Sequence, residues 1–373
     1  MTVPGPVIPS PSIVEPQRQS EGDAMNALPN NSAPNAVTWA RRRLFAGNAV
    51  LAVLAGILIW RWMATDTAGD AIAVAAQRQR PTPEQQFDMQ PLAIPRDEVF
   101  GGGPGKDGIP ALTDPKFVTP ATATYLQPAD QVIGVARGDD ARCYPLKVLN
   151  WHECVNDTVD GTPLAITYCP LCDSSLVFDR RVDGRELEFG VSGLLYNSNV
   201  LLYSRNADGP ETLWSQMKAE GVSGDAVGAS LKTVPFEVTT WSDWKSRYPN
   251  TKVLSPQTGH RRDYSQNPYS RYFAIQTLMF PVRPLPPQGM PYKEPVLGVW
   301  TDGAARAYPL KSLRRIEDSS GLKQTLGSES FTLQLDPPTA TARITEASEG
   351  IDHAYTFWFA WYAFHPETEV YQP

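Results

Sequence analysis

The residues of this chain that are best suited to chemistry lie close together, between Cys143 and Asp179. This stretch holds all four cysteines of the 373-residue chain and one of its four histidines. His152 stands in the segment WHEC, and the segment Cys169-Pro-Leu-Cys172 follows further along the chain. Thiolate sulfur and imidazole nitrogen are preferred ligands of zinc and copper ions. The sequence therefore predicts a transition-metal site, for copper or zinc, with Cys169, Cys172 and His152 as ligands.

The Cys-x-x-Cys spacing is also compatible with other chemistry. A redox pair of the thioredoxin type would lie at the N-terminus of a helix, where the pKa of a thiol falls, but strands are expected on both sides of this pair. A structural disulfide is the simplest alternative, because an exported protein folds in an oxidising compartment. The spacing favours metal binding and leaves both alternatives open.

Further residues extend the candidate site. Glu153 is predicted to be an additional ligand or a catalytic general base, against the commoner case of a carboxylate exposed on a helix. His365 follows a run of aromatic residues and is the candidate for a ligand supplied from a distance, against an ordinary loop histidine. Cys154 has the option of a disulfide with Cys143, and the spacing of the two does not decide this.

The elements that would position these residues are predicted to be strands. Asp160-Gly161 and Asp183-Gly184 are signals for type I′ hairpin turns. They predict the segments PLAITY, SLVFDR, ELEFGV and NVLLYSR as successive strands of an antiparallel meander. The Cys-Pro-Leu-Cys segment would then form the turn between two of these strands.

The chain also contains an internal repeat. Residues 132–149 (VIGVARGDDARCYPLKVL) and 296–313 (VLGVWTDGAARAYPLKSL) align without a gap. Each copy predicts two strands joined by a turn and followed by a short helix. The second copy has Ala307 in place of Cys143 and Ile316 in place of His152, so it keeps the framework without the candidate ligands.

These patterns predict a mainly β (α+β) fold of antiparallel sheets with short helices, built from two related halves. The first half, residues 96–285, would hold the metal-site motifs. The second, residues 286–373, would be a degenerate copy packed on the first. Thirty-five prolines and 27 glycines agree with a strand-rich and loop-rich body. The net charge of −7 offers no basic excess for nucleic-acid phosphates, so no nucleic-acid partner is expected.

The N-terminal segment predicts a membrane anchor. Residues 1–40 are rich in Pro, Ser, Asn and Gln and indicate a disordered cytoplasmic tail. Residues 41–64 begin with three arginines, and the apolar run LFAGNAVLAVLAGILIW follows. This pattern predicts one transmembrane helix in the inner (cytoplasmic) membrane, with the body in the periplasm or outside the cell. Residues 65–95 would form a linker. A cleaved signal peptide and a buried soluble helix are the alternatives.

Several segments resemble, in order, a family of proteins of unknown function. They are WHECVNDT, TYCPLCDSSLVFDR, FGVSGLLYNSNVLLYSR and FWFAWYAFHPET, and the resemblance extends over residues 96–373. The family is bacterial and archaeal, is marked by WHE and CPLC motifs, and its members are typically exported or anchored. The resemblance implies site positions at Trp151, His152, Glu153, Cys169, Cys172 and His365. The chain departs from the family pattern at Cys143, Cys154 and His260, and the family brings no established reaction.

The sequence therefore favours a membrane-anchored, exported metalloenzyme of the oxidoreductase type, with a copper or zinc ion in a Cys/Cys/His site. One alternative is a copper or zinc carrier or assembly factor without catalysis. Another is a structural or interaction domain with a disulfide in its CPLC segment. The membrane is the expected partner through the N-terminal helix, and a small-molecule substrate or a protein partner is left open.

Overall fold

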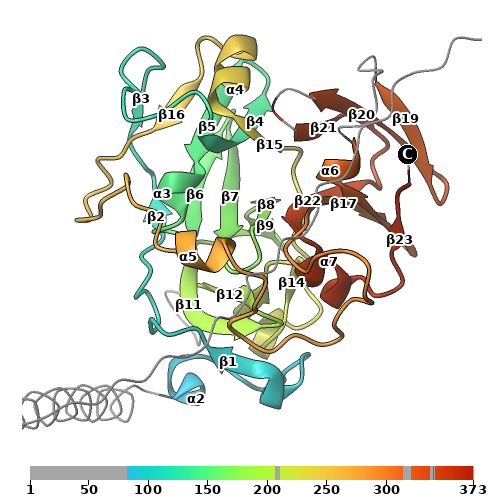
Figure 1. Cartoon of the computed structure of the whole chain (residues 1–373). Helices are drawn as coiled ribbons and strands as arrows, with labels where there is room; N and C mark the ends of the chain where they lie inside the picture. Colours follow the sequence, from blue (N-terminus) through green and yellow to red (C-terminus); the bar gives the residue numbers. More distant parts are fainter. Residues whose placement is uncertain (1–81, 206–210, 314–320, 337–338, 340, 373) are drawn as a thin grey trace, which may run out of the picture. The chain divides into compact units, whose positions relative to one another are not determined.

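The computed structural model describes residues 82–205, 211–313, 321–336, 339 and 341–372. Strands provide most of their regular structure, and the helices between them are short (Figure 1). The predicted mainly β class is confirmed. The predicted tail, the anchor and most of the linker, residues 1–81, lie outside the described residues. Within the described ranges, no helix is long and apolar enough to cross a membrane.

The first copy of the repeat builds a five-stranded mixed sheet, in the order β15-β4-β5-β16-β3. β4 and β5 form an antiparallel hairpin whose turn contains Gly138, with a left-handed φ of 51°. β16 runs parallel to β5. The strands are β3 (Phe117–Val118), β4 (Gln131–Arg137), β5 (Asp140–Pro145), β15 (Glu237–Thr240) and β16 (Lys252–Leu254).

An eight-stranded mixed sheet contains strands of both halves, in the order β2-β6-β7-β8-β22-β17-β18-β23. The halves meet where Ser175 of β8 pairs with Tyr355 of β22. Backbone pairing therefore joins the two halves, in addition to the packing that the sequence predicts. The strands are β2 (Leu112–Thr113), β6 (Cys154–Val159), β7 (Thr162–Cys169), β8 (Ser174–Asp179), β17 (Pro295–Thr301), β18 (Ala304–Pro309), β22 (Asp352–Phe357) and β23 (Glu369–Val370).

The predicted meander is divided between sheets. β6, β7 and β8 are antiparallel neighbours, and Asp160-Gly161 turns between β6 and β7 with φ values of 47° and 71°. Beyond β8 the prediction of one continuous meander is wrong. The free edge of β8 is taken by β22, so the chain forms a small hairpin and then a second five-stranded sheet, β1-β11-β12-β13-β14. The hairpin consists of β9 (Arg181–Val182) and β10 (Arg185–Glu186). The sheet consists of β1 (Val99–Gly101), β11 (Phe189–Tyr196), β12 (Asn199–Ser204), β13 (Leu213–Ser215) and β14 (Glu220–Gly221).

A three-stranded antiparallel sheet and short helices complete the described structure. The sheet consists of β19 (Leu322–Leu326), β20 (Glu329–Asp336) and β21 (Thr341–Ala347). The helices are α2 (Pro83–Gln86), α3 (Leu146–Leu149), α4 (Trp241–Arg247), α5 (Ser270–Phe273), α6 (Leu310–Leu313) and α7 (Trp358–Phe364), with 3-10 turns η1 (Arg96–Glu98) and η2 (Gly224–Ala226).

The two repeat segments adopt the same structure. In β4–β5, Gly134 lies opposite Cys143, and in β17–β18 the matching Gly298 lies opposite Ala307. Each hairpin leads into a four-residue helix, α3 or α6. The predicted strand–turn–strand–helix pattern is confirmed in both copies.

The structural repeat continues further than these hairpins. The segments 239–254 and 356–371 align without a gap and share Thr, Trp, Trp, Pro, Thr and Val at matching positions. Each forms the end of a strand, a seven-residue helix and a strand that runs parallel to its hairpin. In both, a tryptophan of the helix donates from Nε1 to a threonine hydroxyl at 2.9 Å, namely Trp244 to Thr251 and Trp361 to Thr368.

The packed body begins before the predicted boundary near Pro95. Phe87, Met89 and Ile94 are buried in one apolar cluster with residues of β11, β12 and β13. The amide of Ala93 donates to the Val222 carbonyl at 2.9 Å. The end of the predicted linker is therefore part of the folded core.

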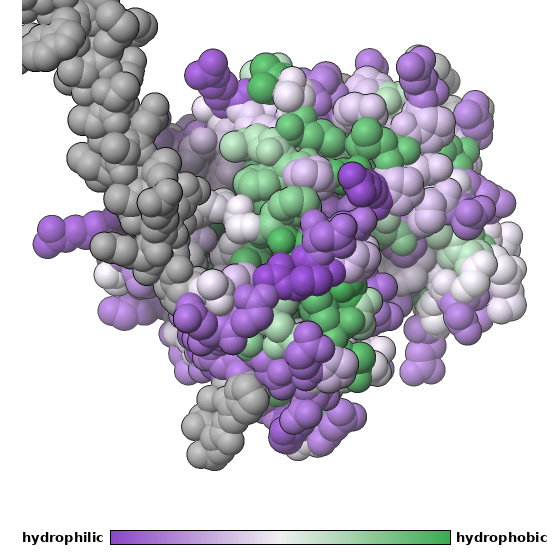
Figure 2. Space-filling view, turned by 90° about the horizontal axis from the view of Figure 1, so that it is seen from below, coloured by the Kyte–Doolittle hydropathy of each residue, from purple (hydrophilic) through white to green (hydrophobic). Residues whose placement is uncertain are grey.

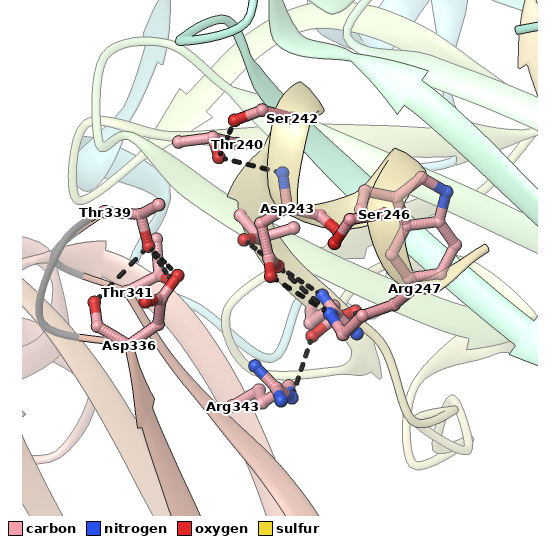
Figure 3. Close-up of polar contacts among 12 residues, drawn as sticks. Thr240, Ser242, Asp243, Ser246, Arg247, Asp336, Thr339, Thr341 and Arg343 are labelled. Carbon is pink, nitrogen blue, oxygen red and sulfur yellow. Dashed lines mark hydrogen bonds and ion pairs between the residues drawn. The ribbon is translucent and has the colours of Figure 1, made fainter. Parts of the chain in front are cut away.

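Charged side chains connect the first sheet to the three-stranded sheet (Figure 3). Arg247 of α4 contacts Asp243 at 2.5 Å and Glu237 at 2.6 Å. Arg343 of β21 lies 3.6 Å from the same Glu237 carboxylate. Because Glu237 is only 7% exposed, the two guanidinium groups compensate a carboxylate that has lost most of its water.

The surface seen from below carries apolar areas between polar ones (Figure 2). Among the described residues, the large apolar side chains that are exposed are Val227, Ile275, Met279 and Leu285. Three of these four lie on the segment that follows α5. This segment also covers the cavity described below.

Candidate functional site

The CPLC segment forms the turn between β7 and β8, as predicted. β7 ends at Cys169 and β8 begins at Ser174. The Cys172 amide donates to the Cys169 carbonyl at 3.2 Å, which closes the turn. Both thiols are free and buried, with Cys169 1% and Cys172 0% exposed. A tight turn between paired strands therefore holds the two sulfur atoms together.

The two thiols have different environments. Burial opposes ionisation of Cys169, but the polar groups of the turn, which are Cys172 and the nearby backbone amides, outweigh it, so the pKa of Cys169 lies below its usual range. Burial raises the pKa of Cys172 well above its usual range, and the hydrogen bond with Cys169 adds to this. Cys169 is therefore the sulfur that ionises first, and Cys172 is its proton-bearing partner.

A second turn faces the sulfur atoms. Asn197 and Ser198 connect β11 to β12 with left-handed φ values of 50° and 63°, as in a type I′ hairpin. The Ser198 carbonyl accepts from the Cys172 thiol at 3.1 Å and lies 3.8 Å from the Cys169 sulfur. The loop between β11 and β12 thus completes the surroundings of the pair.

Glu153 lies near Cys169 although sixteen positions separate them in the chain. Its backbone is left-handed, with φ of 57°, which is rare for a glutamate and is typical of functional sites. The side chain is buried, and the Tyr269 hydroxyl donates to its carboxyl at 3.4 Å. Burial raises the pKa of Glu153 well above its usual range, and the neighbouring Cys169 adds to this. Its surroundings therefore favour the protonated, neutral form of the Glu153 carboxyl.

Glu153, Cys169 and Tyr269 line one cavity of about 80 Å³. Its other walls are apolar or backbone, from the glycine-rich loop after β1, from β11 and β12, and from the segment after α5. They include Ile109, Leu171, Val191, Leu195, Met279 and Phe280. The ionisable sulfur and the carboxylic acid thus share a small, mainly apolar space.

A larger cavity of about 520 Å³ lies against the neighbouring side chains of the same strands. Tyr168 and Asp173 are among its described lining residues, whereas Cys169 and Cys172 are not. Burial raises the pKa of Asp173 to about 6, and its hydrogen bond from the Tyr168 hydroxyl opposes this shift. Because side chains alternate along β7, Tyr168 and Cys169 face opposite sides of the sheet.

His152 is fully buried, and both of its ring nitrogens have partners. Nδ1 lies 2.7 Å from the Pro110 carbonyl, and Nε2 lies 2.7 Å from the Tyr264 hydroxyl. The carbonyl can only accept, so Nδ1 carries the proton and Nε2 accepts from Tyr264. Burial lowers the pKa of His152 to about 4, so the ring is neutral. His152 thus connects the WHE turn to the Pro110 and Tyr264 segments.

The predicted ligands do not gather around one point. Among the described residues, which include His152, Glu153, Cys169, Cys172 and His365, no three His, Cys, Asp or Glu side chains have an arrangement that could hold a metal ion. The two cysteines and Glu153 come together, and the two histidines do not join them.

A buried polar network behind the turn was not predicted. Asn199 donates to Ser174 at 3.0 Å and to Gln216 at 2.8 Å, and Gln216 donates to Thr167 at 2.8 Å. These residues fix the ends of β7, β8 and β12 relative to one another. The signal was present in YNSN and LWSQ, where asparagine and glutamine interrupt strands that are otherwise apolar.

The second half also holds the turn. The Cys172 carbonyl accepts from the Phe357 amide at 2.8 Å and from the Thr356 hydroxyl at 3.1 Å. From the other side, the Tyr272 hydroxyl of α5 donates to the Leu171 carbonyl at 2.9 Å. The position of the sulfur atoms therefore depends on residues far away in the sequence.

The sequence resembles a family of proteins of unknown function, and comparison with known proteins supports this. A family model described as "Protein of unknown function (DUF3179)" matches residues 106–353, which is more than half of the chain. The chain belongs to this family. No curated protein and no solved structure matches it. The WHE and CPLC segments lie inside the matched range, and the terminal segment with His365 lies beyond it.

His365 has a structural counterpart in the first half. Its ring stacks on Trp361 at 4.0 Å and lies 5.3 Å from Trp300. At the matching position of the repeat, Tyr248 packs on Trp244 at 4.1 Å. Burial lowers the pKa of His365 to about 4. The contacts of His365 are thus those of a repeated aromatic pair.

Cys143 and Cys154 belong to separate apolar clusters. Cys143 packs in one cluster with Trp244 and Val253, and Cys154 packs in another with Phe189. Both are free thiols, and burial raises the pKa of each. The structure does not contain the disulfide that the sequence left open.

Proposed function

We propose that Cys169 and Cys172 form a redox-active dithiol and that the protein is an oxidoreductase of the thiol type. The observation that supports this most strongly is the geometry of the pair: two free, buried thiols are held on one tight turn, and the Cys169 sulfur shares a cavity with the Glu153 carboxyl. In the reaction, the pair loses two electrons and two protons and forms one S–S bond, while a substrate gains them.

The means of activation differ from those of a thioredoxin-type pair. There, a helix N-terminus lowers the thiol pKa. Here the polar groups of the turn lower the pKa of Cys169, and the carboxyl of Glu153 lines the same cavity as its sulfur. Glu153 is the acid–base group beside the sulfur, a role that the sequence also suggests for it.

The first prediction is that only one disulfide forms in this chain. After equilibration in glutathione redox buffers, alkylation and mass spectrometry are expected to find Cys169 joined to Cys172, with Cys143 and Cys154 still free. Cys172→Ser should leave Cys169 alkylatable under all conditions. Cys143→Ser is the matched control and should not change the redox midpoint at which the Cys169–Cys172 disulfide forms. A fully reduced pair across the whole series of buffers would contradict the proposal.

Binding of copper(I) by the same two sulfur atoms is a second candidate. Thiolates select soft ions such as Cu(I), which accepts two sulfur ligands, whereas zinc sites use three or four protein ligands. The described site offers two sulfurs without a third ligand, so we favour copper over zinc.

The copper candidate predicts a loss of metal in a single variant. The reduced chain should take up one Cu(I) in competition with a chromogenic chelator, and Cys169→Ser should abolish this. Cys154→Ser is the control with an equally buried thiol. Equal copper content in the wild type and in Cys169→Ser would exclude this second function.

We also propose that residues 41–64 anchor the body at the inner membrane, with the body in the periplasm or outside. The arginines before the apolar run support this orientation. Protease treatment of intact spheroplasts tests it, because an exported body is digested and a cytoplasmic one is protected.

A further inference from the structure

The burial of the two sulfur atoms restricts what can react with them. Cys169 is 1% exposed and Cys172 is not exposed. Thiol–disulfide exchange requires a thiolate to reach a sulfur of its partner directly. A protein disulfide or a charged peptide disulfide therefore reaches them only slowly, after the surrounding segments open. An oxidant that reacts rapidly must enter the cavity beside Cys169.

The size and lining of this cavity define the class of molecule that it admits. One water molecule occupies about 30 Å³ of liquid, so a cavity of about 80 Å³ holds only a few heavy atoms. Its walls are mainly aliphatic and aromatic, and Glu153, Cys169 and Tyr269 supply the polar side chains. A small, uncharged oxidant meets these conditions.

We propose that the cavity admits hydrogen peroxide or a short alkyl hydroperoxide, that Cys169 attacks it, and that Glu153 protonates the departing oxygen. This inference rests on the dithiol function proposed above and names its oxidising substrate. Tyr269, which donates to Glu153, holds the carboxyl at the cavity wall.

The oxidation proceeds in two steps. The Cys169 thiolate attacks the terminal oxygen of ROOH, the O–O bond breaks and an S–OH bond forms. The leaving RO⁻ takes the Glu153 proton and becomes ROH. The Cys172 thiol then attacks the sulfenic sulfur, an S–S bond forms, and the hydroxyl departs as water with the Cys172 proton. The proton that Cys169 released restores Glu153. The sum is two thiols and ROOH converted to one disulfide, ROH and water.

The geometry supports the second step as well as the first. Cys172 lies on the same tight turn as Cys169, closed by the hydrogen bond from its amide to the Cys169 carbonyl, and its thiol donates to the Ser198 carbonyl at 3.1 Å. The turn needs no large rearrangement to bring the resolving sulfur to the sulfenic acid.

The test is rapid-quench alkylation of the reduced full chain with hydrogen peroxide, tert-butyl hydroperoxide or oxidised glutathione. We expect hydrogen peroxide to consume the Cys169 thiol faster than oxidised glutathione does, and to leave Cys143 and Cys154 intact. Cys172→Ser should accumulate a sulfenic acid on Cys169 that dimedone traps. Glu153→Gln, which keeps the shape of the side chain, should slow the reaction by about 100-fold. Unchanged kinetics in Glu153→Gln would overturn its role as proton donor.

A second variant covers the case in which Glu153→Gln does not fold. Met279 lines the cavity but is 61% exposed, so Met279→Ala should fold normally and widen the entrance. This variant is expected to increase the rate of Cys169 oxidation by tert-butyl hydroperoxide more than the rate by hydrogen peroxide. If the ratio of the two rates is the same as in the wild type, entry through this cavity is contradicted. If glutathione buffers form the disulfide but peroxides react no faster, the peroxide inference alone fails. If no oxidant forms it, the dithiol function fails.

Discussion

Gly298→Ala is expected to lower the free energy of unfolding by about 3 kcal/mol. A Cβ at this position would lie 2.1 Å from the Trp361 ring, far inside van der Waals contact. Trp361 is fully buried, and its Nε1 is held by Thr368, so the indole has no free space to move into. Denaturant titration measures the loss as a shift of the unfolding midpoint.

The repeat provides a second site and an exposed strand provides the control. Gly134→Ala should be similarly destabilising, because its Cβ would lie 2.3 Å from Trp244. Gly101→Ala places a Cβ where no heavy atom lies within 4 Å, so its effect should stay within about 0.5 kcal/mol. A Gly298→Ala protein as stable as Gly101→Ala would show that the indole is not locked in place.

Acidification is expected to destabilise the wild type more than His353→Gln. His353 is buried, donates from Nε2 to the Phe236 carbonyl at 2.9 Å and stacks on the Phe236 ring. Burial lowers its pKa to about 4, below the ordinary value of about 6.5. The unfolded chain therefore binds this proton first, and the stability that neutral His353 contributes is complete above pH 6.5 and is lost as the pH falls toward 4.

The expected size follows from the shift. Between pH 7 and pH 4.5 the wild type should lose about 2.5 kcal/mol more than the variant. Glutamine keeps an N–H donor for the Phe236 carbonyl and does not titrate. Carboxyl groups with raised pKa values, such as Asp352, act in the opposite direction but are present in both proteins. Parallel stability curves for the two proteins over this range would contradict the prediction.

Local elements of the fold were predictable because local chemistry determines them. Asp160-Gly161 adopts the left-handed backbone of a type I′ turn, and the flanking strands pair as the sequence indicates. The same holds for the CPLC turn and for both repeat hairpins. In each case neighbouring residues supply the turn and the strand pattern together.

Contacts between distant segments were not predictable in the same way. β22 takes the edge of β8, and no local pattern in either strand indicates this pairing. His152 and Glu153 are neighbours in the chain, yet His152 binds Pro110 and Tyr264 while Glu153 faces Cys169. The left-handed backbone at Glu153 turns the two side chains to different surroundings. The sequence predicts both residues at one site, and in the structure Glu153 lies beside the sulfurs whereas His152 contacts Pro110 and Tyr264. The acid–base role predicted for Glu153 is the part that we retain as a proposal.

The placement of His365 had a signal that sequence reasoning overlooked. The gapless match of 239–254 with 356–371 aligns His365 with Tyr248, each four residues after a tryptophan. A side chain four positions further along a helix lies over the same face. The aromatic stack on Trp361 follows from this spacing.

Loss-of-function substitutions in this chain need not lie near a sulfur atom. The Cys172 carbonyl is held by Thr356 and Phe357, which belong to the copy of the repeat that has no cysteine. The residues that we propose to react and the residues that hold their turn in place thus belong to different halves of one polypeptide. The half without cysteines supports the CPLC turn. Inactivating changes are therefore expected at the β22–α7 junction as well as in the CPLC segment itself.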